Sequence, residues 1–160
     1  MAEEFGWKAM PNPTERTRYF ISYRSTAAFL AERLETDLLA RGHEVWRDKR
    51  SLPVGEAWRA SIKQGIEWCQ TLLLILSEGA EDSKEVRAEV ELASQIGCRV
   101  EAYSIGPVDR LNKENASENA RAIYELLKNL HIAQLPVDGE TEQLLSSAVL
   151  SDTDARHPMD

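Results

Sequence analysis

A dense run of acidic residues between positions 77 and 93, SEGAEDSKEVRAEVELA, offers the clearest source of reactive groups in the chain. It holds six acidic and two basic residues and directly follows an apolar run. A carboxylate beside a ribose can stabilise the positive charge that develops at the anomeric carbon as a glycosidic bond breaks. The segment therefore raises the question of which carboxylate could have this role and which merely face solvent.

Helical geometry separates these acids. Glu89 lies three residues after Val86 and four before Ala93, two members of an apolar stripe, so it is expected at the edge of the buried face. Glu91 is rotated by roughly 200° from Glu89 and should face solvent. Glu85 stands one turn before Glu89, close enough for the two carboxylates to touch. The acids at the start of the segment complement the helix dipole, which explains them without catalysis.

Polar and aromatic side chains follow three short apolar runs. Tyr23, Arg24 and Ser25 follow the first run, Trp46 ends the second and Ser77 follows the third. An arginine can hold a phosphate, and an aromatic ring can stack on a flat base. Together with a carboxylate, these groups would suit cleavage of a nucleotide's N-glycosidic bond. Taken alone they are weak evidence, because exposed arginines are common and serines at strand ends more often cap helices.

Strand and helix patterns alternate along the chain. Short apolar runs predict strands at residues 18–22, 43–47, 71–76, 99–105 and 131–135. Apolar residues repeating every three or four positions predict helices at about 26–41, 58–69, 86–97, 120–130 and 140–150. Residues 1–16 are expected to form a flexible N-terminal segment, residues 17–150 one domain, and residues 151–160 a disordered tail.

This alternation predicts an α/β fold. A parallel sheet with helices on both faces results when strands and helices alternate at short spacing. Right-handed crossovers leave few topologies, and we expect a flavodoxin-like five-stranded parallel sheet of order 2-1-3-4-5. Ligands bind such sheets beyond the carboxyl ends of the strands, at the switch point between the first and third strands. The polar residues that follow these two strands should therefore meet at one crevice.

Several other chemistries lack the residues they need. A receiver domain requires an acidic pair after the first strand and a phosphoacceptor Asp after the third, where this chain has ISYR and LS. No GxGxxG follows the first strand, and no P-loop is present. Ser22, Ser25 and Ser77 have no His and Asp at nucleophile spacing.

Composition narrows the partners. The net charge is −8 and no basic stripe is visible, so binding to nucleic acid or to an anionic membrane is not expected. The N-terminus lacks a signal-peptide pattern and no apolar run could cross a bilayer, which predicts a cytoplasmic location. Cys69 and Cys98 are too far apart in sequence for a disulfide framework or a zinc motif. His43, His131 and His157 lack metal-ligand spacing, so neither a metal nor a cofactor is expected.

Three stretches resemble the signature regions of the bacterial type of the Toll/interleukin-1 receptor (TIR) domain family. They are RYFISYRS, LLARGHEVWRDKRSLPVGEAWRASIKQGIEWCQTLLLILS and SKEVRAEVELA, and the resemblance spans roughly residues 17–135. FISYR is similar to the family's first-strand motif. DKRSLPVGEAW is similar to the loop after the second strand, through which members interact. By this resemblance, Asp48, Leu52, Pro53 and Gly55 belong to an interaction loop.

The resemblance implies two possible functions. Some TIR domains assemble with other TIR domains and catalyse nothing. Others, common among bacterial and plant members, cleave NAD+ at the nicotinamide–ribose bond with a glutamate on the third helix, in a pattern close to Trp-x-x-x-Glu. That glutamate corresponds to Glu89, and Glu85 stands where the tryptophan is usual.

We therefore expect an NAD+ nucleosidase in which Glu89 is the catalytic residue. The expected substrate-binding residues are Tyr23, Arg24, Ser25, Trp46, Ser77 and Glu85. By resemblance the enzyme would be active on self-assembly, in defence signalling or virulence, with NAD+ and other TIR domains as its partners. The alternative is a non-catalytic TIR–TIR interaction module. A nucleoside deoxyribosyltransferase-like enzyme has a related sheet and a catalytic glutamate, but the DKRSLPVGEAW loop argues against it.

Overall fold

A five-stranded parallel sheet forms the centre of the protein. The computed structural model describes residues 17–47, 55–130, 132–136 and 141–156. The strand order is β2-β1-β3-β4-β5, and all neighbouring strands run parallel. The strands are β1 (Arg18–Ser22), β2 (Glu44–Arg47), β3 (Thr71–Leu76), β4 (Arg99–Ile105) and β5 (Ile132–Leu135). The predicted fold class and strand order are confirmed.

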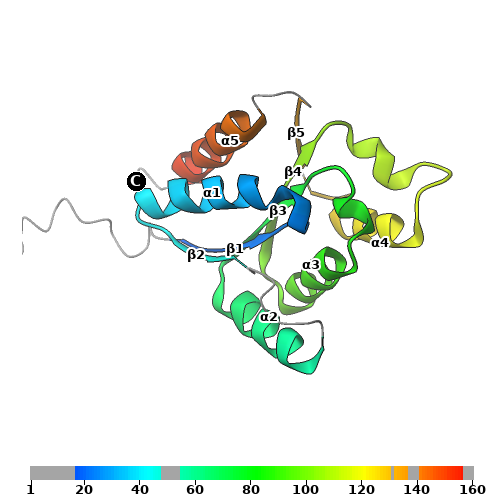
Figure 1. Cartoon of the computed structure of the whole chain (residues 1–160), viewed down its shortest axis with the longest axis horizontal. Helices are drawn as coiled ribbons and strands as arrows, with labels where there is room; N and C mark the ends of the chain where they lie inside the picture. The colour runs from blue at the N-terminus through cyan, green and yellow to red at the C-terminus, as the bar shows by residue number, and fades with distance from the viewer. Residues whose placement is uncertain (1–16, 48–54, 131, 137–140, 157–160) are drawn as a thin grey trace, which may run out of the picture.

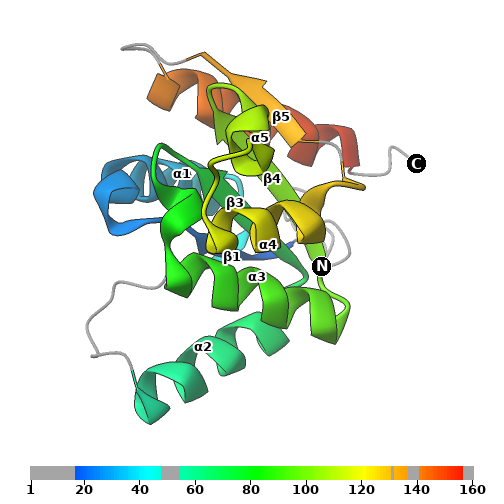
Figure 2. The ribbon, with the colours of Figure 1, turned by 90° about the vertical axis from the view of Figure 1, so that its right-hand side faces the viewer.

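Helices cover both faces of this sheet (Figure 1). One layer consists of α1 and α5, and the other consists of α2, α3 and α4, which lie side by side in Figure 2. The helices are α1 (Ala28–Ala40), α2 (Glu56–Trp68), α3 (Lys84–Ile96), α4 (Glu118–Leu127) and α5 (Thr141–Arg156). The described residues also form the 3-10 turns η2 (Ser25–Ala27), η3 (Ala80–Asp82) and η4 (Val108–Asn112). Each layer has its own apolar core against the sheet.

The central strand β3 divides its side chains between the two cores. All six of its residues are buried, as its continuous apolar sequence TLLLIL predicts. Leu72, Leu74 and Leu76 belong to the core under α2–α4. Leu73 and Ile75 belong to the core under α1 and α5. The strand therefore holds both layers on one sheet.

The neighbouring strand β1 alternates in the same way, because successive strand residues point to opposite faces. Tyr19 and Ile21 lie in the α1/α5 core, whereas Phe20 lies in the α2–α4 core. Ser22, the last residue of β1, is fully buried and follows the parity of Phe20. It therefore faces the α2–α4 layer at the carboxyl end of the strand.

The element boundaries agree closely with the sequence patterns in most places. The residues expected to end the first and third helices, Gly42 and Gly97, both have a φ of 89°, a left-handed value that suits glycine. At the other end of the chain, the expected disordered tail from residue 151 is partly wrong, since α5 continues to Arg156. Residues 141–157 contain no Gly or Pro that would end a helix, and Pro158 is the first such residue. The helical conformation is disfavoured for the residue before a proline. The predicted flexible segment 1–16 lies outside the described residues.

The described residues contain neither a membrane-spanning helix nor a cluster of metal-binding side chains. None of their helices combines the length and apolar character that crossing a membrane requires. They also contain no group of three or more His, Cys, Asp or Glu side chains arranged to hold a metal ion.

Trp46 on β2 packs tightly against α2. A Cβ atom added at Gly65 would lie 2.7 Å from the indole ring, so only a glycine allows this approach. The ring of Trp68 lies on the same side, with its centroid 6.2 Å from that of Trp46. The edge strand is therefore anchored to α2 by an aromatic pair seated on a glycine.

Replacing Gly65 with alanine should lower the free energy of unfolding. Overpacking a filled site costs about 1–3 kcal/mol, of which the higher helix propensity of alanine returns about 1 kcal/mol. We expect a net loss of about 1 kcal/mol, measured by urea denaturation. Gln64→Ala, at the exposed neighbouring position, should change stability by less than about 0.5 kcal/mol. A Gly65→Ala protein as stable as Gln64→Ala would contradict this packing.

Candidate active site

The carboxylate of Glu89 lies buried between α3 and the end of β1. Its residue is only 1% exposed. The Ser22 hydroxyl donates a hydrogen bond to Glu89 Oε1 at 2.6 Å, a short O–H···O distance. The serine orients the carboxylate from the sheet, at the carboxyl end of a strand. The prediction that Glu89 sits at the buried face of its helix is confirmed.

Local sequence explains why α3 presents Glu89 in this way. The helix begins at Ser83, whose side chain accepts a hydrogen bond from the Val86 amide at 3.1 Å. Val86, Val90 and Ala93 are buried against the sheet, on the same face as Glu89. Glu91 instead pairs with Arg87 at 3.0 Å on the helix surface. The two carboxylates therefore lie in different environments although they are two residues apart.

The rim of the crevice joins the residues after β1 to the residues after β3. Arg24 Nη1 donates to the Glu78 carbonyl at 3.3 Å. Its guanidinium lies on Gly79, where an added Cβ would be 1.7 Å from Arg24 Nη1. Ser25 is exposed at the start of η2, and Ser77 is half-buried. The structure thus brings Arg24 to the loop after β3, at the expected switch point.

One polar atom near this rim lacks a partner. Within the described part of the chain, the Ser77 hydroxyl oxygen is buried and makes no hydrogen bond. Buried hydroxyl groups are nearly always hydrogen-bonded in folded proteins. An orphaned hydroxyl at the end of the central strand is therefore a group that a polar ligand could satisfy.

Tyr23 faces away from this site. It is 3% exposed and belongs to the core under α1 and α5, on the opposite face of the sheet from Ser22. Its hydroxyl accepts a hydrogen bond from Arg47 Nη1 at 3.3 Å, and Arg47 Nε pairs with Glu35 on α1 at 2.8 Å. The prediction that Tyr23 frames a substrate base is wrong, because strand alternation turns it into the other layer.

Trp46 is likewise engaged elsewhere. Its ring lies on Gly65 and near Trp68, so it serves to pack β2 on α2. Trp46 is half-buried, with part of its ring against Gly65, and the expectation that it frames the base stays a prediction.

Glu85 lies in the first turn of α3, where a negative charge suits the helix dipole. The Ser83 hydroxyl is 3.3 Å from Glu85 Oε1. The position where the family usually has a tryptophan therefore carries a carboxylate that interacts with the start of its own helix.

Most of the predicted interaction loop cannot be compared with the structure. Asp48, Leu52 and Pro53 lie outside the described residues. Gly55 is described and precedes the first turn of α2, where its carbonyl accepts the Arg59 amide at 2.9 Å. A Cβ added to Gly55 would meet no atom within 4 Å.

Arg110, on η4, binds the carboxyl ends of both β3 and β4. Its Nη2 donates to the Leu76 carbonyl at 2.8 Å. Its Nη1 donates to Ser104 Oγ at 3.0 Å and to the Pro107 carbonyl at 2.6 Å. Its Nε pairs with Glu81 at 3.2 Å, and both side chains are largely buried. One guanidinium therefore fixes the strand ends behind the crevice.

Nothing in the sequence marks Arg110 for this position. It stands in a charged segment rich in turn residues, GPVDRLNKEN, where an arginine normally reads as a solvated side chain. The one available signal is the adjacent Leu111, which is fully buried and shows that the segment folds back on the sheet.

The strand order, with polar residues gathered at the carboxyl ends of β1 and β3, defines a flavodoxin-like α/β domain. A family model described as a TIR domain matches residues 20–145. The chain therefore belongs to the TIR domain family, as its signature stretches predicted.

Solved structures support the fold alone, because their sequence identities are low. The TIR domains in the structure of the activated Roq1 resistosome, which directly recognises the pathogen effector XopQ, align with 15% identity and a TM-score of 0.60, covering 85% of this chain and 98% of that chain. The sugar isomerase domain of an RpiR transcription factor from Sphaerobacter thermophilus aligns with 12% identity and a TM-score of 0.55, covering 91% and 74%. A putative quinone reductase from Klebsiella pneumoniae aligns with 13% identity and a TM-score of 0.51, covering 87% and 84%. No curated protein matches the chain.

Replacing Arg110 with alanine should destabilise the protein strongly. The change removes charged hydrogen bonds from carbonyls at the ends of β3 and β4, and we expect a loss of about 2–3 kcal/mol of unfolding free energy in urea. Arg87→Ala is the matched control, because it removes an arginine from a surface ion pair worth about 0.3–0.5 kcal/mol. Equal losses for the two variants would show that Arg110 does not hold the strand ends together.

Proposed function

We propose that this protein is an NAD+ nucleosidase that cleaves the nicotinamide–ribose bond, with Glu89 as its catalytic residue. The supporting observation is the buried Glu89 carboxylate, oriented by Ser22 at the carboxyl end of β1. Glu89 also occupies the position at which NAD+-cleaving members of the TIR family carry their glutamate. A fixed negative charge at the ligand crevice is what this reaction requires.

The chemistry of the bond explains why one carboxylate is enough. The nicotinamide of NAD+ carries a positive charge on its ring nitrogen, so it leaves as a neutral base when it takes the bonding electron pair. Positive charge then develops on the ribose, where a preorganised carboxylate stabilises it. Water adds to the anomeric carbon and releases a proton, which gives ADP-ribose, nicotinamide and H+. No acid has to protonate the leaving group.

Burial strengthens this effect. Electrostatic interactions are far stronger in a site from which water is excluded than at the surface. The Ser22 hydrogen bond keeps the carboxylate in one orientation, so little reorganisation is needed as the bond breaks. In this proposal Ser22 positions the carboxylate and does not attack the substrate.

The rim supplies groups for the rest of the substrate. Arg24 follows β1, and its exposed side chain contacts the loop after β3. Its guanidinium can therefore bind the negatively charged pyrophosphate. The Ser77 hydroxyl, without a partner among the described residues, can bind a polar group of the ligand. Glu85 does not provide an aromatic wall, and the proposed mechanism does not require one.

The biological setting is a second part of this proposal. The TIR domains of Roq1 belong to an activated resistosome that recognises a pathogen effector. We extend to this protein a role in defence signalling or virulence, with activity on self-assembly.

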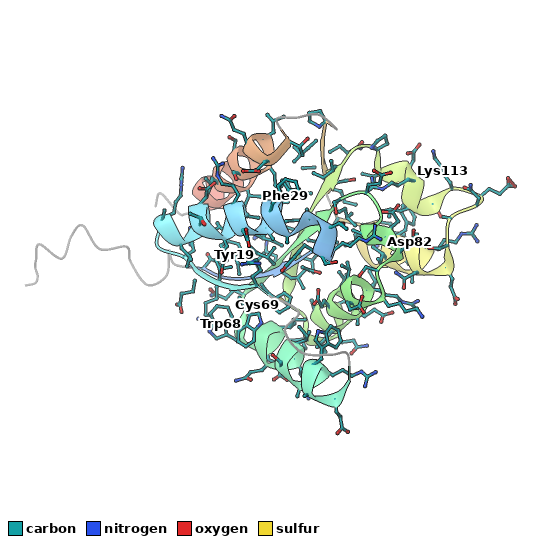
Figure 3. The ribbon with its side chains drawn as sticks, in the orientation of Figure 1. Tyr19, Phe29, Trp68, Cys69, Asp82 and Lys113 are labelled. Carbon is teal, nitrogen blue, oxygen red and sulfur yellow. The ribbon has the colours of Figure 1, made fainter. Side chains whose placement is uncertain are left out.

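An interaction module without turnover is the second candidate. The α1/α5 layer exposes three large apolar side chains: Phe29 at 58%, Leu39 at 51% and Leu144 at 36%. Figure 3 labels Phe29 on α1, on the side of the sheet away from α2. Exposed apolar side chains in one layer favour contact with another protein surface. Self-association through this layer would leave the Glu89 crevice on the other face of the sheet.

Glu89→Gln should reduce nicotinamide release from NAD+ by about 10²–10³-fold, since it removes the charge that stabilises the transition state. The amide oxygen can still accept the Ser22 hydrogen bond, so the fold should be retained. Glu91→Gln, two residues away on the exposed side of the same helix, is the control and should retain activity. If the wild-type protein releases no nicotinamide at high concentration, the proposed NAD+ nucleosidase activity is wrong. If Glu89→Gln is fully active, the catalytic role of Glu89 is wrong.

Phe29→Glu should weaken self-association, because it places a charge in the exposed apolar part of the α1/α5 layer. We expect the average mass in light scattering to fall toward that of the monomer at high protein concentration. Ile96→Glu is the control, as Ile96 is also an exposed apolar residue, at 43%, but lies at the end of α3. Unchanged association in Phe29→Glu, or equal loss in both variants, would argue against this surface.

A further inference from the structure

The only two cysteines of the chain meet in the folded protein. Cys69 follows α2 and Cys98 follows α3, and their Sγ atoms lie 3.4 Å apart. The sheet register brings them near each other, because Thr71 of β3 pairs with Arg99 of β4, and Cys69 and Cys98 lie two residues and one residue before that pair. Figure 3 labels Cys69 beside Trp68, where α2 meets the sheet.

We propose that Cys69 and Cys98 form a redox pair, in which a peroxide reversibly joins them in an intramolecular disulfide. Both are free thiols in this structure. This assignment rests on their contact in the fold and does not depend on the proposed cleavage of NAD+.

The geometry requires only a small movement. The two sulfur atoms must approach by roughly 1.4 Å to reach a disulfide bond length of about 2.0 Å. Cys98 directly follows Gly97, which has a φ of 89° and no atom within 4 Å of where a side chain would be. The chain around Cys98 therefore has open space on one side, where it can adjust. Cys69 can stay in place in the core while Cys98 moves toward it.

The two thiols differ in access. Cys98 is half-buried and lines a pocket of about 640 Å³, together with residues of α3, α4 and β4. Cys69 is 8% exposed and is absent from that lining. A small oxidant can therefore reach Cys98 through the pocket, whereas Cys69 is reached through Cys98.

The contact between the thiols also favours Cys98 as the thiol that reacts first. Either thiol can donate in this contact; with Cys69 as the donor, the hydrogen bond lowers the pKa of Cys98, although partial burial opposes this. The same contact, together with burial, raises the pKa of Cys69. Because the thiolate is the nucleophile, Cys98 should react first. The Cys69 Sγ also lies 3.3 Å from the Ile66 carbonyl oxygen, a second acceptor for its proton.

The reaction balances in two steps. The Cys98 thiolate attacks one oxygen of hydrogen peroxide, which forms a sulfenic acid and releases hydroxide. The Cys69 sulfur then attacks the Cys98 sulfur, which forms the disulfide and expels the second oxygen as water after proton transfer. Two thiols are oxidised by two electrons and one peroxide is reduced to two waters. A dithiol reductant reverses the change by thiol–disulfide exchange.

The test treats the full chain with hydrogen peroxide and measures intact mass and free thiols. We expect a monomer about 2 Da lighter, since two hydrogen atoms are lost. Both thiols should disappear and return with dithiothreitol, and a non-reduced digest should contain the peptides of Cys69 and Cys98 joined. Retention of two thiols, gain of oxygen without loss of hydrogen, or a disulfide between two chains would overturn the pair.

Two single variants test the order of reaction. In Cys69→Ser the remaining Cys98 has no partner, so peroxide should add one oxygen, about 16 Da, within the time that the wild type needs to form its disulfide, and a second peroxide should then bring the gain to about 32 Da. In Cys98→Ser the buried Cys69 should keep its thiol over the same period. Equal oxidation of the two variants would overturn the assignment of Cys98 as the attacking thiol. The mass of the oxidised wild-type protein shows by itself whether the disulfide forms, even if the variants do not fold.

Discussion

The site depends on a carboxylate buried at the junction of β1 and α3. Glu89 is 1% exposed, and its carboxyl oxygen Oε1 accepts a hydrogen bond from the Ser22 hydroxyl at 2.6 Å. Moving an ionised carboxylate out of water costs several kcal/mol, and apolar side chains of similar volume are often as stable in such places. Glu89 is therefore poorly explained as a contribution to stability. In the proposed function, this carboxyl group serves the substrate at the point where this sheet topology receives ligands.

Basic groups fix the backbone around that charge. Arg110 holds the ends of β3 and β4 and pairs with Glu81, while Arg24 rests on Gly79 at the rim. These guanidinium groups act mainly on backbone carbonyls, which the strands leave unpaired where they end. The carboxyl edge of the sheet is thus held by side chains as well as by the ladder.

The sequence predicts well what depends on local periodicity, and less well what depends on distant contacts. The central strand and Glu89 could both be placed, because burial of one and orientation of the other follow from neighbours within two turns. Tyr23 was predictable in principle, since its parity in β1 sends it to the opposite face from Ser22. Trp46 was not, because its environment is set by a glycine nineteen residues later. Arg110 likewise acquires its partners only when four separate segments meet.

The parity of β1 has a further consequence for how this domain can change over time. Ser22 and Tyr23 are adjacent in the chain, yet one serves the Glu89 layer and the other the α1/α5 layer. Among the described residues, the two layers pack on opposite faces of the sheet, whose central strand is buried throughout. Substitutions on the outer surface of α1 and α5 can therefore accumulate without altering the residues around Glu89. A single domain can in this way vary one outer surface while the residues around Glu89 stay the same.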